Sequence, residues 1–134
     1  MNDALAVART YIGKATYRRY VHEDEAPFVV NCITLARWIY RLRGISLPPD
    51  YLSWLALGTP IARTAIAPYD LVFTDGYRNQ LVEVVGKIGH VGIVTERDGI
   101  IHATTNVGIE EISLDLFFKK RTFCCARRIP WEGA

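Results

Sequence analysis

Hydrophobic residues in the first part of the chain recur at intervals of three and four, the spacing of one face of an α-helix. Leu5, Ala8 and Ile12 form such a stripe over residues 4–12, and Gly13 follows at the position where helices commonly stop. The periodicity is then lost across a long stretch rich in tyrosine, arginine and acidic residues. Irregular connections of this length are unusual in a compact domain, which favours a functional role for the stretch.

The helical period returns at residues 32–43, where Leu35 and Ile39 share a face with Cys32. Asn31 precedes this segment and is suited to cap the helix. Cys32 therefore lies in the first turn, where the helix dipole and free backbone N–H groups favour a thiolate. We take this cysteine as the candidate nucleophile.

The remainder of the chain predicts strands with little helix. A short helix is expected from Asp50 to about Gly58, residues 59–68 are expected to be a loop, and Ser113 can cap a last helix through Phe118. Strands are expected at 70–74, 81–85, 90–96, 100–103 and 123–128. The order predicts an α+β fold: one domain over residues 1–134, with N-terminal helices packed on an antiparallel sheet of about five strands.

A cysteine nucleophile needs a base, and the base needs a group that orients it. His90 and His102 lie on neighbouring strands of a predicted hairpin. If the turn centres on residues 97–99, Val94 lies opposite His102 and the two imidazoles are about 13 Å apart in a regular ladder. A shifted register or an asymmetric turn is then required for the histidines to meet.

The bulk composition narrows the class of protein. Half of the 134 residues are hydrophobic, 22% are charged and the net charge is +2, which indicates a globular chain and gives no basis for nucleic-acid binding. No apolar run is long enough for a membrane span, so no membrane partner is expected. Three cysteines, two of them adjacent, do not suggest a disulfide framework. We expect a cytoplasmic product without a signal peptide, unless a non-classical, phage or effector route delivers it outside.

Five short segments, taken in order, resemble the NlpC/P60 cysteine peptidases, papain-like enzymes that cut cell-wall peptides. The segments are Asn31-Cys32-Ile33, Gly44-Ile45-Ser46-Leu47-Pro48, Tyr69-Asp70-Leu71-Val72-Phe73, His90-Val91-Gly92-Ile93 and Ile101-His102-Ala103. Each is weak alone, but their order along nearly the whole chain is specific. The resemblance implies a papain-like NlpC/P60 fold and hydrolysis of an amide bond, most simply in a peptidoglycan stem peptide.

The resemblance also implies roles for single residues. Cys32 would be the nucleophile, His90 the base and His102 the residue that orients His90. The backbone N–H of Cys32 would help to hold the oxyanion. Tyr17 or Tyr20, of which Tyr17 is preferred, would match the tyrosine upstream of the cysteine, whose hydroxyl faces the site. Tyr17 and Asn31 are the candidate substrate contacts. No cofactor or metal is implied, and an immunity or inhibitor protein is expected as a partner if the protein is a delivered effector.

The chain departs from the family pattern around the cysteine. Asn31 replaces the usual aspartate, which in some members binds a free amine of the substrate, and Ile33-Thr34 replace Ser-Gly. These changes leave two other functions open: acyl transfer or deamidation on another amide with the same triad, and a non-catalytic binding module. A zinc site formed by Cys32, His90 and His102 is a further alternative, although close ligand pairs such as Cys-x-x-Cys are missing.

Overall fold

The computed structural model describes residues 3–75 and 88–131. The α-helices in this part of the chain are α1 (Ala4–Arg9), α2 (Cys32–Leu42), α3 (Tyr51–Trp54) and α4 (Leu114–Lys120). Two single 3₁₀ turns, η1 (Glu23–Glu25) and η2 (Arg63–Ala65), lie in the connections. Helix α2 begins at Cys32 as predicted, whereas α1 and α3 are shorter than the periodicity indicated.

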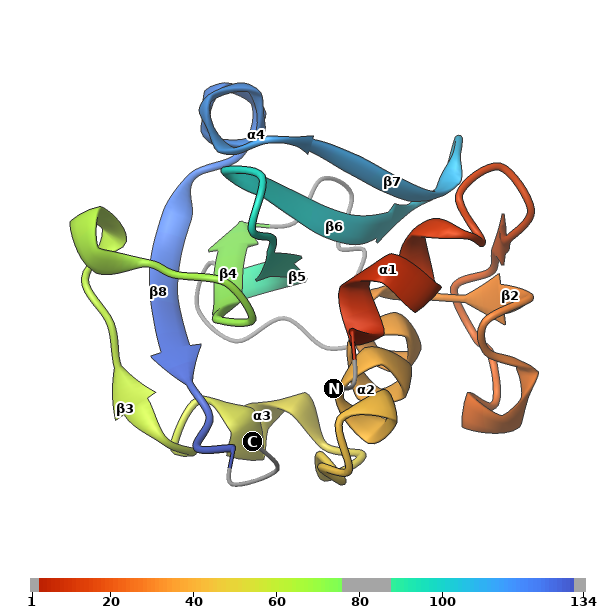
Figure 1. The fold of residues 1–134 in the computed structure, drawn as a ribbon, viewed down its shortest axis with the longest axis horizontal. Helices are drawn as coiled ribbons and strands as arrows, with labels where there is room; N and C mark the ends of the chain where they lie inside the picture. Colours follow the sequence, from red (N-terminus) through yellow and green to blue (C-terminus); the bar gives the residue numbers. More distant parts are fainter. Residues whose placement is uncertain (1–2, 76–87, 132–134) are drawn as a thin grey trace.

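The strands of the described residues form one six-stranded antiparallel sheet and a separate parallel pair. The sheet order is β3-β8-β4-β5-β6-β7, built from β3 (Thr59–Pro60), β4 (Leu71–Asp75), β5 (Ile88–Val94), β6 (Gly99–Thr104), β7 (Gly108–Ser113) and β8 (Phe123–Arg128). The parallel pair joins β1 (Thr16–Tyr17) to β2 (Val29–Val30), directly before α2. Figure 1 shows α1 and α2 grouped beside the sheet, and α4 at the end of β7 that lies away from α1. The α+β prediction is confirmed, with more strands than expected.

Four strands of the described residues were not predicted, and the paired β1 and β2 lie in the stretch expected to be irregular. The other two belong to the six-stranded sheet. The short β3 lies within the segment expected to be a loop, and β7 follows β6 as the return of a hairpin. The adjacent acids Glu110 and Glu111 hid β7 by breaking its hydrophobic pattern. Their side chains take opposite directions in the structure, with Glu110 bonded to His102 and Glu111 bonded to Arg9. The predicted strand at 81–85 lies outside the described residues.

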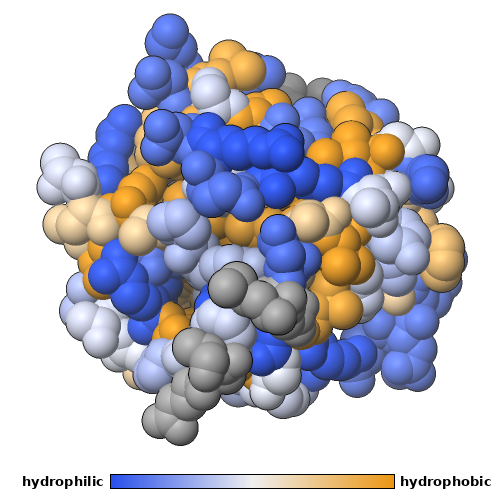
Figure 2. All heavy atoms as spheres, viewed as in Figure 1, coloured by the Kyte–Doolittle hydropathy of each residue, from blue (hydrophilic) through white to orange (hydrophobic). Residues whose placement is uncertain are grey.

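The sheet separates two hydrophobic clusters. The larger cluster packs α1 and α2 against alternate residues of the central strands, among them Phe73, Val91 and Ile101. The smaller cluster uses the intervening positions, and Phe117 of α4 is buried in it. Side chains that reach the surface are mixed, since Figure 2 shows hydrophobic residues interspersed among hydrophilic ones on the face in view. None of the described helices is long and apolar enough to cross a membrane.

The hairpin between β5 and β6 corrects the predicted register. Val94 pairs with Ile100, not with His102, and Ile93 pairs with Ile101. The turn centres on Arg97, one residue earlier than expected, with Asp98 in the left-handed region at φ 53° and the Thr95 N–H bonded to the Gly99 carbonyl. This shift brings His102 two positions closer to His90 along the ladder than a turn centred on residues 97–99 would allow.

Candidate active site

Helix α2 holds Cys32 through a reciprocal cap at its first turn. The Asn31 side-chain oxygen accepts the Thr34 backbone N–H at 2.8 Å, and the Asn31 N–H donates to the Thr34 hydroxyl at 3.0 Å. The Asn31 amide nitrogen also donates to the carbonyl of Arg19 at 3.0 Å. The capping prediction is confirmed. Because both ends of the Asn31 amide have structural partners, its contact with substrate stays a prediction.

The Cys32 thiol is enclosed, with 1% of the residue exposed. Burial raises the pKa of Cys32 to about 12. The backbone N–H groups of Val91, Cys32 and Ile33 and the charge of Arg121 act in the opposite direction but are outweighed. The helix terminus therefore favours the thiolate, as expected, but burial outweighs it and keeps the thiol protonated. Since Val91 follows His90 in β5, the thiol lies against the strand that carries the candidate base.

The two histidines meet directly. His90 Nε2 and His102 Nδ1 are 2.7 Å apart, and both residues are almost completely buried. Gly92 makes this possible, because a Cβ at this position would lie 2.7 Å from Ile100 Cδ1 and 3.3 Å from the Cβ of His102. The structure thus brings together the pair that the predicted register would have kept apart. Among the described residues the other nitrogen of His90, Nδ1, has no hydrogen-bond partner.

A carboxylate continues this chain of side chains. Glu110 lies directly opposite His102 in the β6–β7 ladder, and its Oε2 is 2.9 Å from His102 Nε2. The imidazole holds the pKa of Glu110 below its usual range. Desolvation lowers the pKa of His102 and, more strongly, that of His90, whose pKa lies well below 6.5. Both imidazoles are consequently neutral at pH 7.

Tyr17 and Arg121 border the thiol from two further elements. Tyr17 is half-buried on β1, and desolvation together with the nearby Cys32 raises its pKa to about 12. Arg121 follows α4, and its charge acts on Cys32, His90 and His102 alike. Tyr17 is therefore close to the thiol, and its contact with substrate stays a prediction.

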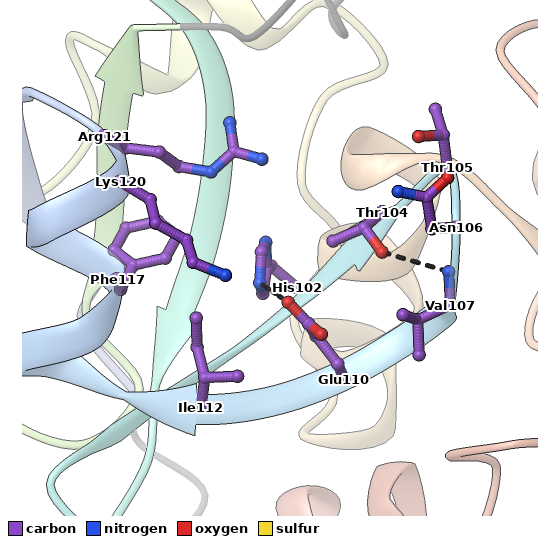
Figure 3. A pocket seen from close by; sticks show the side chains of 10 residues that line it. All are labelled: His102, Thr104, Thr105, Asn106, Val107, Glu110, Ile112, Phe117, Lys120 and Arg121. Atoms are coloured by element: carbon purple, nitrogen blue, oxygen red, sulfur yellow. Dashed lines mark hydrogen bonds and ion pairs between the residues drawn. The ribbon is translucent and has the colours of Figure 1, made fainter.

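A cavity of about 380 Å³ opens beside the far edge of His102. Its lining includes Glu110, Lys120 and Arg121, and Figure 3 shows Lys120 extending toward the hydrogen-bonded His102–Glu110 pair. The cavity is lined on its apolar side by Phe117, whose ring packs edge-on against His102 with centroids 5.1 Å apart. Glu110 thus connects the buried histidine pair to a cavity that solvent can enter.

A second cavity, of about 310 Å³, gathers the residues at which the sequence departs from the expected motif. Asn31, Ile33 and Thr34 line it together with His22 and Glu23 of the acidic segment. Glu23 forms ion pairs with two arginines of α2, Arg37 and Arg41. Because its charge is already matched, Glu23 is poorly suited to select a cationic substrate.

Comparison with known proteins agrees with this geometry. The profile of the NlpC/P60 family matches residues 17–128, from β1 to the end of β8. The chain belongs to the NlpC/P60 family. A curated relative, the probable endopeptidase NlpC of Escherichia coli strain K12, is 34% identical over 87 residues, which are 63% of this chain and 51% of the relative. The chain therefore spans about half the length of that protein.

Solved NlpC/P60 structures share the fold. NlpC2 from Trichomonas vaginalis superposes with a TM-score of 0.73 at 20% identity, covering 96% of this chain and 45% of the other. The NlpC/p60 domain of the peptidoglycan hydrolase SagA gives a TM-score of 0.67 at 23% identity, covering 94% and 96%. At these identities the likeness establishes the fold alone.

Two features of this NlpC/P60 site were not foreseen. Glu110 was missed because its strand was missed, although Asn106 and Gly108 are turn signals that would have placed it opposite His102. Arg121 belongs to no recognised motif, and its place near the thiol depends on how α4 packs.

The zinc alternative gains no support, because no group of three His, Cys, Asp or Glu side chains suited to a metal is found in residues 3–75 and 88–131.

Proposed function

We propose that this NlpC/P60 domain is a cysteine peptidase or amidase in which Cys32 is the nucleophile, His90 the general base and His102 the residue that orients it. The observation that carries the proposal is the arrangement of the buried thiol and the histidine pair. The sulfur lies on the backbone of Val91, next to His90, and the Nε2 of His90 is held by His102. Only Nδ1 of His90 is left to accept a proton.

The pKa directions define the starting protonation state. The thiol is neutral because burial raises its pKa to about 12, and His90 is neutral because burial lowers its pKa well below 6.5. A neutral thiol beside a neutral imidazole favours general-base catalysis over a preformed ion pair. Catalytic hydrogen bonds commonly tighten when substrate binds, so the contact between Sγ and Nδ1 is expected to close in that complex.

The reaction then follows the usual course of a thiol hydrolase. Nδ1 of His90 takes the Cys32 proton as the sulfur attacks the substrate carbonyl, and the backbone N–H of Cys32 stabilises the oxyanion. The C–N bond breaks, the leaving amine takes the proton from His90, and a thioester remains on Cys32. Water, deprotonated by His90, hydrolyses the thioester and returns the thiol.

A bacterial cell-wall peptide is the substrate class we propose, because the NlpC/P60 family comprises cell-wall peptidoglycan hydrolases. The cavity lined by Asn31, Ile33 and Thr34 supports a second candidate within the same chemistry. There the thioester passes to an amine, or the leaving group is ammonia, so that the enzyme is an acyltransferase or deamidase. An inhibitor or immunity protein remains a prediction for the case of a delivered effector.

Digestion of purified muropeptides, followed by mass spectrometry, tests the proposal. The parent protein should release new peptide ends, and Cys32→Ala should release none while keeping its thermal unfolding temperature near that of the parent. Cys124→Ala is the matched control, because it removes a second free cysteine that is partly exposed on β8. The thiol of Cys124 donates to the carbonyl of Thr122. Cleavage by Cys32→Ala at the parental rate would contradict the proposal, and ligation or deamidation products would favour the second candidate.

A further inference from the structure

The hydrogen bond between His102 and Glu110 extends the histidine pair by one residue. The three side chains lie in the order Glu110, His102, His90, and the contacts between them are 2.9 Å and 2.7 Å. Glu110 and His102 are cross-strand partners, so the ladder itself fixes the first contact. The order ends at His90 in β5, the strand on which the Cys32 sulfur lies.

The chemistry of a carboxylate determines where the protons are. An ionised carboxylate only accepts hydrogen bonds, so His102 Nε2 must carry a proton and donate it to Glu110. A neutral His102 then has a lone pair at Nδ1 and accepts a hydrogen bond from the Nε2–H of His90. The lone pair of His90 is left at Nδ1, the buried nitrogen without a partner among the described residues. One acidic residue thus specifies the tautomer of both imidazoles.

The surroundings explain why a carboxylate is needed. Burial disfavours the charged form of both histidines, and the cations Lys120 and Arg121 disfavour it further at His102. Glu110 acts in the opposite direction, since its hydrogen bond and its charge raise the pKa of His102. Without Glu110, a positive charge on the histidine pair would be placed among buried apolar groups and two cations.

We propose that Glu110 is a positioning residue that orders the protons of the His90–His102 pair and stabilises its positive charge while His90 holds the proton of Cys32. The proposal rests on the function proposed above. In the step concerned, the proton leaves Sγ and bonds to Nδ1 of His90, and His90 keeps its Nε2–H bond to His102. The positive charge is then balanced by Glu110 through His102, until His90 gives the proton to the leaving amine.

The pH dependence of the pair involves charged and titratable groups from several elements. They are Glu110 on β7, His90 on β5, Lys120 and Arg121 at the end of α4, Cys32 on α2 and Tyr17 on β1. Of these, Glu110 is the group that raises the pKa of His102, whereas burial, Lys120 and Arg121 lower it. Replacing Glu110 by a neutral residue should therefore shift the protonation of His102 to lower pH.

Glu110→Gln tests the proposal, because glutamine preserves the shape of the side chain and removes its charge. We expect kcat to fall by roughly 10- to 100-fold, less than for loss of a direct acid–base residue, and KM to change little. The acid limb of the kcat profile should move to lower pH. Glu110→Asp, which keeps the charge, should recover part of the loss. Glu111→Gln is the matched control, since Glu111 bonds Arg9 on the other side of the same strand.

Nitrogen-15 NMR of the histidine rings gives a second readout that needs no substrate. In the parent, Nε2 of both His90 and His102 should be protonated and Nδ1 should not, and His102 should titrate at lower pH in Glu110→Gln. An unchanged titration of His102, or an unchanged kcat, would overturn the proposal. If the parent cleaves no wall peptide, the proposed function fails, and the NMR titration still decides the role of Glu110.

Discussion

Gly92→Ala perturbs the contact on which the candidate site depends most. A Cβ at residue 92 would lie 2.7 Å from Cδ1 and 2.8 Å from Cγ1 of Ile100, and 3.3 Å from the Cβ of His102. The first two distances are clashes, and Ile100 is completely buried in the smaller hydrophobic cluster. The new methyl therefore displaces Ile100, pushes on His102, or both.

The expected magnitude follows from overpacking of a dense core. Adding a methyl to a filled interior costs about 1–3 kcal/mol, because neighbouring side chains must leave their preferred rotamers. With an unfolding entropy of about 2.1 cal/mol/K per residue, this lowers the Tm of a chain of this length by roughly 4–10 °C. A displacement of His102 by a few tenths of an ångström also lengthens its contact with His90, so kcat should fall.

A double-mutant cycle with Ile100→Val separates this clash from other causes. Valine removes Cδ1, the nearest atom to the added methyl, at a cost of about 0.5–1.5 kcal/mol on its own. We expect urea denaturation to show that the double variant is more stable than the sum of the single effects predicts. A fully stable and active Gly92→Ala protein, or strictly additive effects, would refute the account of how Gly92 admits the histidine pair.

Two other predictions concern residues that support the site. Asn31→Asp restores the residue usual in the family, but it should lower the free energy of unfolding by about 1 kcal/mol, because an acceptor would face the Arg19 carbonyl in place of the donor now 3.0 Å away. Arg9→Met should cost about 1–2 kcal/mol at pH 7, because Arg9 donates two hydrogen bonds to the mostly buried Glu111.

The pH dependence of the Arg9 effect has a defined sign. Arg9 lowers the pKa of Glu111 below its usual 4.5. A carboxylate whose pKa is lower in the folded state stabilises the fold at pH values above its pKa in the unfolded state. This stability is lost as the pH falls through its pKa in the folded state. The parent and Arg9→Met should therefore differ in urea denaturation at pH 7 and converge in acid below pH 4.5. A constant difference at all pH values would contradict this explanation.

For Asn31→Asp, a gain in the free energy of unfolding would contradict the expected clash between the new carboxylate and the Arg19 carbonyl.

Local sequence signals predicted the parts of the site that local chemistry determines. Asn31 and Cys32 were placed because a capping residue, a helical period and the start of α2 coincide within a few residues. Strand β8 was predicted with its observed bounds, because its pattern of apolar and polar residues can be recognised without knowing which strands it pairs with. The order of the motifs was sufficient to indicate the family.

Features that depend on pairing and packing could not be read from the sequence. The register that joins His90 to His102 depends on a turn that centres one residue earlier than the turn signals indicated. Placing Glu110 opposite His102 required the prediction of β7, and the acidic residues of that strand interrupt its hydrophobic pattern. The effect of the helix start on the thiol could be predicted, because it is local, whereas the burial that raises the pKa of Cys32 depends on the strands and side chains packed around it.

Trapping the thioester on Cys32 is the most direct test of the proposal that Cys32 is the nucleophile. The parent protein would be mixed with a muropeptide, quenched in acid within one turnover, digested and sequenced by mass spectrometry. Our account predicts that the acyl half of the substrate is attached to the peptide that contains Cys32, and that this adduct is lost as product forms. Release of product with no adduct on Cys32, or with the adduct on another residue, would contradict it.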